Sequence, residues 1–232
     1  MEQRKSRNYY QRFKEQVDAA VKEGKKPSLL LHACCAPCSS HVLSVVAEYF
    51  DVTVFFYNPN IDDKEEYDKR LAELERFVAE AGFAAGTRVV DGGYGPEEFF
   101  RMAQGRGDLP EGGERCYDCY KLRLEKTAGY AKDHGFDYFS TTLSISPYKR
   151  SDWINELGVE LAKAMEGVEG APAFLFSDFK KENGYKHSIE LSKEYCLYRQ
   201  DYCGCIFSKQ ERERKLKEKE NKDSTEISKE FG

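Results

Sequence analysis

The chain of 232 residues lacks any run of about 18 apolar residues, which is the length that a membrane-spanning helix requires. Its first 26 residues are strongly charged rather than apolar, so we expect neither a signal peptide nor a membrane location. An excess of basic residues is also absent, since the net charge is −5, which is unlike a bulk nucleic-acid binder. Internal repeats are absent as well. These absences favour a cytoplasmic globular protein.

The charge is distributed unevenly along the chain. Residues 1–26 hold eight Lys or Arg against four acidic residues, and residues 209–222 hold seven against four. Such local basic stretches can contact a polyanion. A solvated helix face is nevertheless the commoner role of a charge run, and both interpretations stay open.

Hydrophobic periodicity predicts helices that alternate with strands. Apolar residues spaced by four predict a helix over 8–23, and apolar runs predict strands over 28–33, 51–57, 87–91, 137–143 and 174–176. Further helices are expected over 39–50, 62–81, 96–103, 116–134 and 153–165. The alternation predicts an α/β fold with a mainly parallel sheet, helices on both faces and a cysteine-containing C-terminal extension. We expect a single domain over 1–208, with an N-terminal helix within 1–27, and a charged, flexible tail over 209–232.

The eight cysteines fall at the end of the first predicted strand, at a helix start and after the last strand: Cys34, Cys35 and Cys38; Cys116 and Cys119; and Cys196, Cys203 and Cys205. A chain of this length buries a sizeable core, so it does not need disulfide staples. Thiolate sulfur is both a soft metal ligand and a redox centre. In a reducing compartment, clustered cysteines therefore indicate metal binding or redox work.

The pair Cys116 and Cys119 predicts half of a four-coordinate site. Residues three apart at a helix start can direct their side chains to one side, and the positive end of the helix favours thiolates. The other two ligands are expected among the first group of thiols, which contains two consecutive cysteines. A tetrahedral zinc ion prefers a Cys-x-x-Cys pair, whereas a cubane iron–sulfur cluster has more widely separated corners and accepts consecutive thiolates more easily. This difference favours [4Fe–4S] over zinc.

The segment Cys203-Gly204-Cys205 predicts a different kind of site. A disulfide between residues two apart closes a very tight ring, and a strained disulfide is readily reduced. Gly204 relieves part of the backbone cost. A reversible redox pair is therefore more sensible than a permanent bond, although two free thiols or two metal ligands are equally weighted on spacing alone. Cys196 has no partner pattern, and we expect it to be a small buried apolar residue.

Taken together, the clusters resemble those of the QueH-type epoxyqueuosine reductases. The matching segments are Leu30–Cys38, Tyr57–Ile61, Glu114–Leu124, Thr141–Lys149 and Tyr202–Cys205, which spread over about residues 28–208. The resemblance implies an adenine nucleotide α hydrolase-like (HUP) sandwich without a phosphate loop. It also implies the last step of queuosine synthesis, in which epoxyqueuosine at the wobble position of tRNA is reduced to queuosine.

The same resemblance implies roles for particular cysteines. The ligands of a [4Fe–4S] cluster map to Cys34, Cys35, Cys116 and Cys119, and a redox-active disulfide maps to Cys203–Cys205. Some members of the family hold a further iron beside the cluster, for which Cys38 is a candidate ligand. The implied partners are tRNA with epoxyqueuosine in its anticodon loop and an unidentified electron donor.

Two other interpretations fit parts of the pattern. Residues 35–38 resemble the Cys-x-x-Cys of thioredoxin-like dithiol oxidoreductases, although such folds do not need the additional thiol pairs. A four-cysteine zinc module that binds tRNA or protein without catalysis would use the same thiols. Metal analysis of anaerobically purified protein separates the three, because they require about four irons with sulfide, no metal, or about one zinc.

Overall fold

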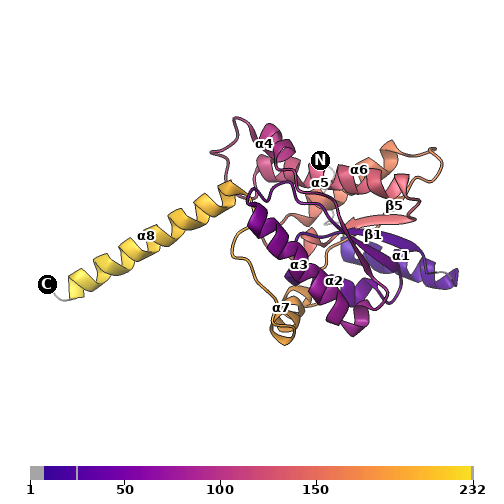
Figure 1. Cartoon of the computed structure of the whole chain (residues 1–232), viewed down its shortest axis with the longest axis horizontal. Helices are drawn as coiled ribbons and strands as arrows, with labels where there is room; N and C mark the ends of the chain where they lie inside the picture. Colours follow the sequence, from indigo (N-terminus) through magenta and orange to yellow (C-terminus); the bar gives the residue numbers. More distant parts are fainter. Residues whose placement is uncertain (1–7, 25, 231–232) are drawn as a thin grey trace, which may run out of the picture.

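The protein folds around one sheet of five parallel strands, in the order β3-β2-β1-β4-β5 (Figure 1). The computed structural model describes residues 8–24 and 26–230, with side chains placed as far as residue 219. The strands are β1 (Ser28–His32), β2 (Asp51–Phe56), β3 (Arg88–Asp91), β4 (Tyr138–Thr141) and β5 (Ala173–Phe174). The predicted α/β class with a parallel sheet is confirmed.

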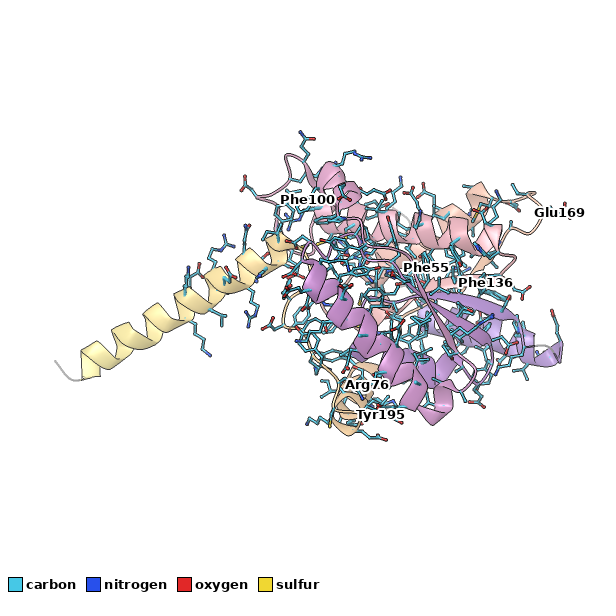
Figure 2. All side chains as sticks on the ribbon, in the orientation of Figure 1. Phe55, Arg76, Phe100, Phe136, Glu169 and Tyr195 are labelled. Atoms are coloured by element: carbon cyan, nitrogen blue, oxygen red, sulfur yellow. The ribbon has the colours of Figure 1, made fainter. Side chains whose placement is uncertain are left out.

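Helices cover both faces of the sheet, as predicted. In Figure 1, α5 (Glu114–Asp133) and α6 (Ser151–Ala164) lie on one side, and α2 (Ala36–Val46), α3 (Lys64–Glu80) and α7 (Gly184–Glu194) lie on the other. The central strands are consequently apolar along their whole length, and Leu29, Leu30 and Leu31 of β1 are fully buried. Figure 2 shows side chains filling the space between the sheet and these helices.

Two further helices complete the body of the protein. The amphipathic helix α1 (Tyr9–Lys22) buries Tyr9, Phe13 and Val17 of the apolar face that the four-residue spacing predicted, whereas Val21 is exposed. Phe13 packs edge-on against Phe179. Helix α4 (Glu97–Ala103) begins directly after Pro96 and packs against α5. Residues 1–7 of the predicted N-terminal segment lie outside the described residues.

Several element boundaries differ from the sequence prediction. Helix α2 begins at Ala36 instead of Ser39, because Pro37 occupies its first turn, where a missing N–H costs nothing. Strand β4 ends at Thr141, and Thr142–Ile145 forms a 3-10 turn, η2, where a strand to residue 143 was expected. Helix α3 begins at Lys64 and ends at Glu80, where a helix over 62–81 was expected, and the 3-10 turn η1 (Gly82–Ala84) follows it.

The C-terminal segment forms a helix. Helix α8 (Ile206–Glu230) leaves the body of the protein and projects into solvent (Figure 1). The predicted flexibility of residues 209–232, like the predicted domain boundary before them, stays a prediction. Within the part of the chain that the structure describes, no helix is both long and apolar enough to cross a bilayer.

The strand order reverses between β1 and β4, and this reversal positions a site. In an open parallel sheet, connections that leave neighbouring strands in opposite directions open a crevice at the carboxyl ends of those strands, where ligands bind. The Cys34 segment follows β1, and η2 follows β4. Both therefore lie at the mouth of this crevice.

His32, at the end of β1, fixes the walls of the crevice. Its Nε2 donates to the carbonyl of Tyr57 at 3.0 Å, so Nδ1 accepts the hydroxyl proton of Thr141 at 2.8 Å. These bonds join the ends of β1, β2 and β4. His32 is fully buried, and burial lowers its pKa to about 3, so the ring is neutral.

Candidate active site

Three thiols form a compact group where β1 turns into α2. The Sγ atoms of Cys34 and Cys35 lie 3.7 Å apart, and those of Cys34, Cys35 and Cys38 all lie within 4.8 Å of one another. The strand has already ended at His32, and Cys35 is the N-cap residue of α2, so consecutive side chains no longer point to opposite faces. With a metal–sulfur bond of about 2.3 Å, ligands of one tetrahedral ion lie about 3.8 Å apart. The three sulfurs could therefore hold a metal ion.

Electrostatics in this group favour one thiolate shared by three sulfurs. Hydrogen bonds from Cys35 and Cys38 place the pKa of Cys34 well below its usual value. Burial raises the pKa of Cys35 to about 12, and hydrogen bonding to Cys34 raises the pKa of Cys38. A cation bound here would displace the remaining protons, because the thiolate is the ligand form.

The second thiol group lies at the start of α5, two residues inside the helix. Cys119 is buried, and burial raises its pKa to about 12. Cys116 is partly exposed and accepts a hydrogen bond from the backbone N–H of Gly112 at 3.3 Å. Both sulfurs line a cavity of about 20 Å³, which Cys203 and Cys205 also line. The structure thus brings the second and third thiol groups together.

The third group is held through its backbone. Arg70 Nη1 and Asn60 Nδ2 donate to the carbonyl of Cys203 at 3.3 and 3.4 Å. Gly204 has φ +114°, and a Cβ there would lie 2.9 Å from Ile61 Cγ1, so only glycine fits this turn. Cys203 and Cys205 are both free thiols, which is the reduced form of the predicted redox pair.

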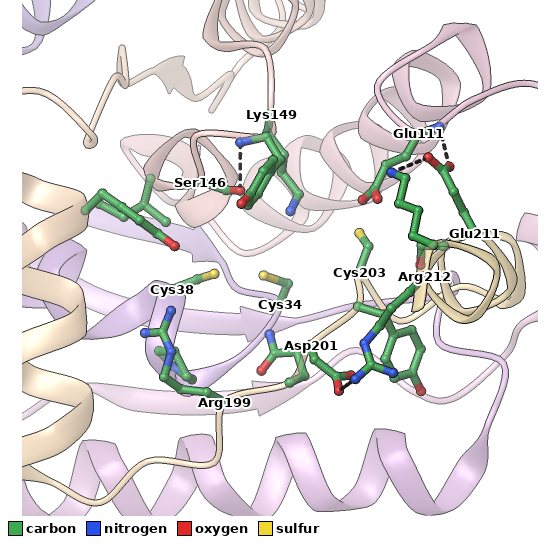
Figure 3. Close-up of a pocket in the computed structure, with 18 of the residues that line it drawn as sticks. Cys34, Cys38, Glu111, Ser146, Lys149, Arg199, Asp201, Cys203, Glu211 and Arg212 are labelled. Atoms are coloured by element: carbon green, nitrogen blue, oxygen red, sulfur yellow. Dashed lines mark hydrogen bonds and ion pairs between the residues drawn. The ribbon is translucent and has the colours of Figure 1, made fainter. Parts of the chain in front are cut away.

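Cys203 and Lys149 connect the small cavity with a larger one. The larger cavity has a volume of about 540 Å³ and is lined by Cys34, Cys38, Lys149 and Cys203. Figure 3 shows the sulfurs of Cys34 and Cys38 on one side of this hollow, Cys203 facing them, and Lys149 reaching in from above. Three thiol groups that are far apart in the sequence therefore surround one region.

These sulfur–sulfur distances concern only two members of the predicted four-thiolate set, Cys34 and Cys35. Among the described residues, the compact group within 4.8 Å contains Cys34, Cys35 and Cys38, without Cys116 or Cys119. The corners of a cubane lie farther apart than the ligands of a single ion, so this spacing does not test the set. The assignment of Cys34, Cys35, Cys116 and Cys119 to one cluster stays a prediction.

Two cations of this region suit an anionic centre. The Arg123 side chain from α5 is 1% exposed, and its Nη1 and Nη2 have no hydrogen-bond partner among the described residues. The pKa of Lys149 is lowered by burial but raised further by the thiols of Cys203 and Cys34, so it lies above its usual value. A buried cation without a partner is costly, whereas a metal centre ligated by several thiolates carries negative charge. The residues present therefore fit an iron–sulfur cluster.

The larger cavity opens outward into a groove with aromatic and basic walls. Tyr148 is 77% exposed at its edge, and Tyr185 and Tyr202 also line it. One face of α8 forms part of the wall, with residues spaced as on one helical stripe: Ser208, Glu211, Arg212, Lys215, Leu216 and Lys219. Five cations line the groove against three carboxylates, although the whole chain carries a net charge of −5.

Sequence reasoning missed the cations beside the thiols and mispredicted the burial of one cysteine. Arg70 and Arg123 are buried and Lys149 is partly buried, but isolated basic residues are normally exposed and carry no signal. Lys149 ends the segment Thr141–Lys149 that resembles the family, and this position was its one usable signal. The prediction that Cys196 is buried is wrong. It is exposed just beyond α7, in the left-handed conformation with φ 50°.

Comparison with known proteins identifies the family. The family model described as "Epoxyqueuosine reductase QueH" matches residues 29–211. A protein of that name from Streptococcus pyogenes serotype M1 is 41% identical over 203 residues, covering 87% of this chain and 78% of that protein. The namesakes from Staphylococcus epidermidis and Thermotoga maritima are 39% and 38% identical, covering 87% and 81% of this chain and 84% and 93% of their own lengths. The chain belongs to the epoxyqueuosine reductase QueH family.

Proposed function

We propose that this protein reduces epoxyqueuosine to queuosine at the wobble position of tRNA, as the last step of queuosine synthesis. One observation carries the proposal. Cysteines from three distant segments surround a single region at the carboxyl edge of the sheet, and Cys203 lines both of its cavities. Family membership supplies the substrate, and the thiols supply the means of reduction. A cytoplasmic location follows from a tRNA substrate.

The chemistry requires two electrons and two protons. Removing the epoxide oxygen leaves an alkene and releases the oxygen as water. Oxidation of the Cys203 and Cys205 thiols to a disulfide supplies two electrons and two protons, so the reaction balances. An electron donor then returns the disulfide to the dithiol, and that donor is unidentified.

We assign the [4Fe–4S] ligands to Cys34, Cys35, Cys116 and Cys119. When bound, the cluster would supply one-electron transfer and, alone or with an adjacent iron, a Lewis acid for the epoxide oxygen. The close spacing of Cys38 to Cys34 and Cys35 suits the ligand sphere of one ion, so Cys38 is a candidate ligand of an additional iron. Cys203 lines both the groove and the small cavity that contains Cys116 and Cys119. This position suits the transfer of electrons between substrate and cofactor.

The groove suits a nucleotide taken out of the anticodon loop. A cavity of about 540 Å³ is in the range of small-molecule sites, and its openness to solvent leaves room for the rest of the loop. Unpaired bases stack on aromatic side chains, and Tyr148 and Tyr202 are available for this. Arg212 and Lys215 of α8 line the same groove, which suits contacts with the flanking phosphates of the RNA.

The decisive experiment is anaerobic reconstitution with iron and sulfide, followed by metal analysis and an assay on tRNA that contains epoxyqueuosine. We expect about four or five irons with sulfide per chain, and queuosine as the product. One zinc and no turnover would support the non-catalytic zinc module instead. Full turnover without metal would support the thioredoxin-like interpretation.

Cysteine variants test the individual assignments. Cys34→Ala and Cys116→Ala should lose cluster absorbance and turnover, and Cys203→Ser should keep the cluster but lose turnover with a physiological reductant. The matched control is Cys196→Ser, because Cys196 is exposed beyond α7 and lines neither cavity. A Cys34→Ala protein with full absorbance and turnover would remove that residue from the ligand set.

A further inference from the structure

Arg123 is, among the described arginines, the one whose buried hydrogen-bond donors have no partner. The structure buries three arginines among its described residues: Arg70, Arg115 and Arg123. Arg70 pairs with Glu66 and donates to the carbonyl of Cys203, and Arg115 donates to three carbonyls of the loop over 106–109. Arg123 donates only through Nε, to the carbonyl of Cys119 at 3.1 Å, and its Nη1 and Nη2 have no partner among the described residues.

The surroundings of Arg123 contain sulfur but no compensating carboxylate. Within the described part of the chain, no Asp or Glu forms an ion pair with Arg123 or with Lys149. The groups that act electrostatically on Arg123 are the thiols of Cys119, Cys203 and Cys34, together with Tyr120. These three cysteines come from the three separate thiol groups. Arg123 therefore lies at the point that all of them share.

A guanidinium in this position needs an anion. Burying a charge without a partner is among the costliest arrangements in a protein, and the donors of Arg123 remain unsatisfied against neutral thiols. Thiolates that ligate a metal centre would supply negative charge at the required place, because ligation removes their protons. The small cavity lined by Arg123, Cys116, Cys119, Cys203 and Cys205 is closed to any large anion, since its volume is about 20 Å³.

We propose that Arg123 is the buried counter-ion of the sulfur-ligated redox centre and sets its reduction potential. This inference rests on the proposed function. Arg123 is a positioning residue, since it acts on the centre and not on the substrate. Reduction adds negative charge to the centre, and a fixed cation with two free N–H donors stabilises that charge. Arg123 thereby makes the centre easier to reduce and helps to retain it.

The test compares variants of the reconstituted, full-length protein by redox titration. Arg123→Gln removes the charge but keeps N–H donors, and Arg123→Lys keeps the charge. We expect a more negative midpoint potential in Arg123→Gln, a smaller shift in Arg123→Lys, and lower iron and sulfide content in Arg123→Gln. The matched control is Arg115→Gln, which loses a buried guanidinium from the same small cavity but one whose bonds all go to backbone carbonyls. Its potential should shift less than that of Arg123→Gln, because Arg115 acts electrostatically on Cys116, whereas Arg123 acts on Cys119, Cys203 and Cys34.

The outcomes separate this inference from the proposed function. An unmodified protein that takes up no iron and sulfide overturns the proposed function and this inference with it. If the unmodified protein takes up the centre, and Arg123→Gln has the same midpoint potential and the same iron content, this inference alone is overturned. Equal shifts in Arg123→Gln and Arg115→Gln would also overturn it, because they would show a general effect of disturbing the cavity. If Arg123→Gln does not fold, Arg123→Lys carries the test. A midpoint potential more negative than that of the unmodified protein supports the inference, because lysine lacks the two guanidinium N–H donors, and an unchanged potential with full iron content overturns it.

Discussion

Replacing Gly204 with alanine should disable the dithiol while leaving the fold largely intact. A backbone conformation with φ +114° costs a non-glycine residue about 1–3 kcal/mol. The added Cβ would also lie 2.9 Å from Ile61 Cγ1 and 3.1 Å from Arg70 Nη1, and overpacking of this kind costs about 1–3 kcal/mol. The two costs sum to about 2–6 kcal/mol. The loss of folding stability should not exceed this sum, because the turn can relax by moving away from Arg70.

The matched control is Gly129→Ala. Gly129 lies within α5, and a Cβ there would meet nothing within 4 Å, so alanine should stabilise the helix by about 0.5–1 kcal/mol. For a chain of this size, 1 kcal/mol shifts the midpoint of thermal unfolding by roughly 2–4 °C. We therefore expect a lower midpoint for Gly204→Ala and a slightly higher one for Gly129→Ala, measured by circular dichroism.

Turnover should fall further than stability in Gly204→Ala. The carbonyl of Cys203 loses its bonds to Arg70 and Asn60 when the turn moves, so the thiol no longer faces both cavities. We expect turnover on epoxyqueuosine-containing tRNA to fall at least tenfold at a temperature where the variant is still folded. Equal midpoints and equal turnover in Gly204→Ala and Gly129→Ala would refute the structural argument for this turn.

Three further predictions test other parts of the structure. The double variant Arg212→Gln/Lys215→Gln, on the groove face of α8, should weaken tRNA binding. It should also reduce the slope of log affinity against log salt concentration by about 1.4. The control Arg214→Gln/Lys217→Gln removes two cations that do not line the groove, and it should change neither the affinity nor the slope. Burial lowers the pKa of His32 to about 3 and that of His41 to about 4, both below the unfolded value of about 6.5, so the unfolded chain binds more protons. Stability to urea should be complete above about pH 6.5 and should fall toward pH 4, by up to about 1.4 kcal/mol per pH unit from His32 and by less from the partly exposed His41, which solvent screens. A flat profile would contradict this. Gly158→Ala should lower the midpoint of thermal unfolding, because a Cβ at Gly158 would lie 2.3 Å from the Phe174 ring; a midpoint that rises as in Gly129→Ala would show that α6 and β5 do not pack as described.

Periodicity in the sequence predicted the elements around the sheet but not their arrangement. The strand over 28–33 and the helix over 116–134 were predicted within two residues, because local apolar spacing decides both. Helix α7 was missed, since its buried face consists of Gly184, Ser188, Leu191 and Ser192, which include only one large apolar residue. The order of the strands depends on contacts between distant segments, which spacing along the chain does not record.

The candidate site was predicted in its sulfur chemistry and missed in its charges. Clustered cysteines are rare enough to be informative, and Cys34, Cys35 and Cys38 do form a compact group directly after β1. Arg123 could not be recognised, because the burial of a guanidinium depends on the whole packing of α5 against the crevice. The exposure of Cys196 was missed for a similar reason, since a left-handed residue after a helix is set by the path of the following chain.

The anchoring of Cys203 through its carbonyl has a consequence for catalytic turnover. Arg70 and Asn60 grip the main chain of this residue, and neither of them bonds to its sulfur. Rotation about the Cα–Cβ bond can therefore swing the sulfur between staggered orientations while the peptide stays where it is. A cycle of oxidation and reduction then requires only a change of the Cys203 side-chain rotamer. The backbone of the surrounding loops stays in place from one cycle to the next.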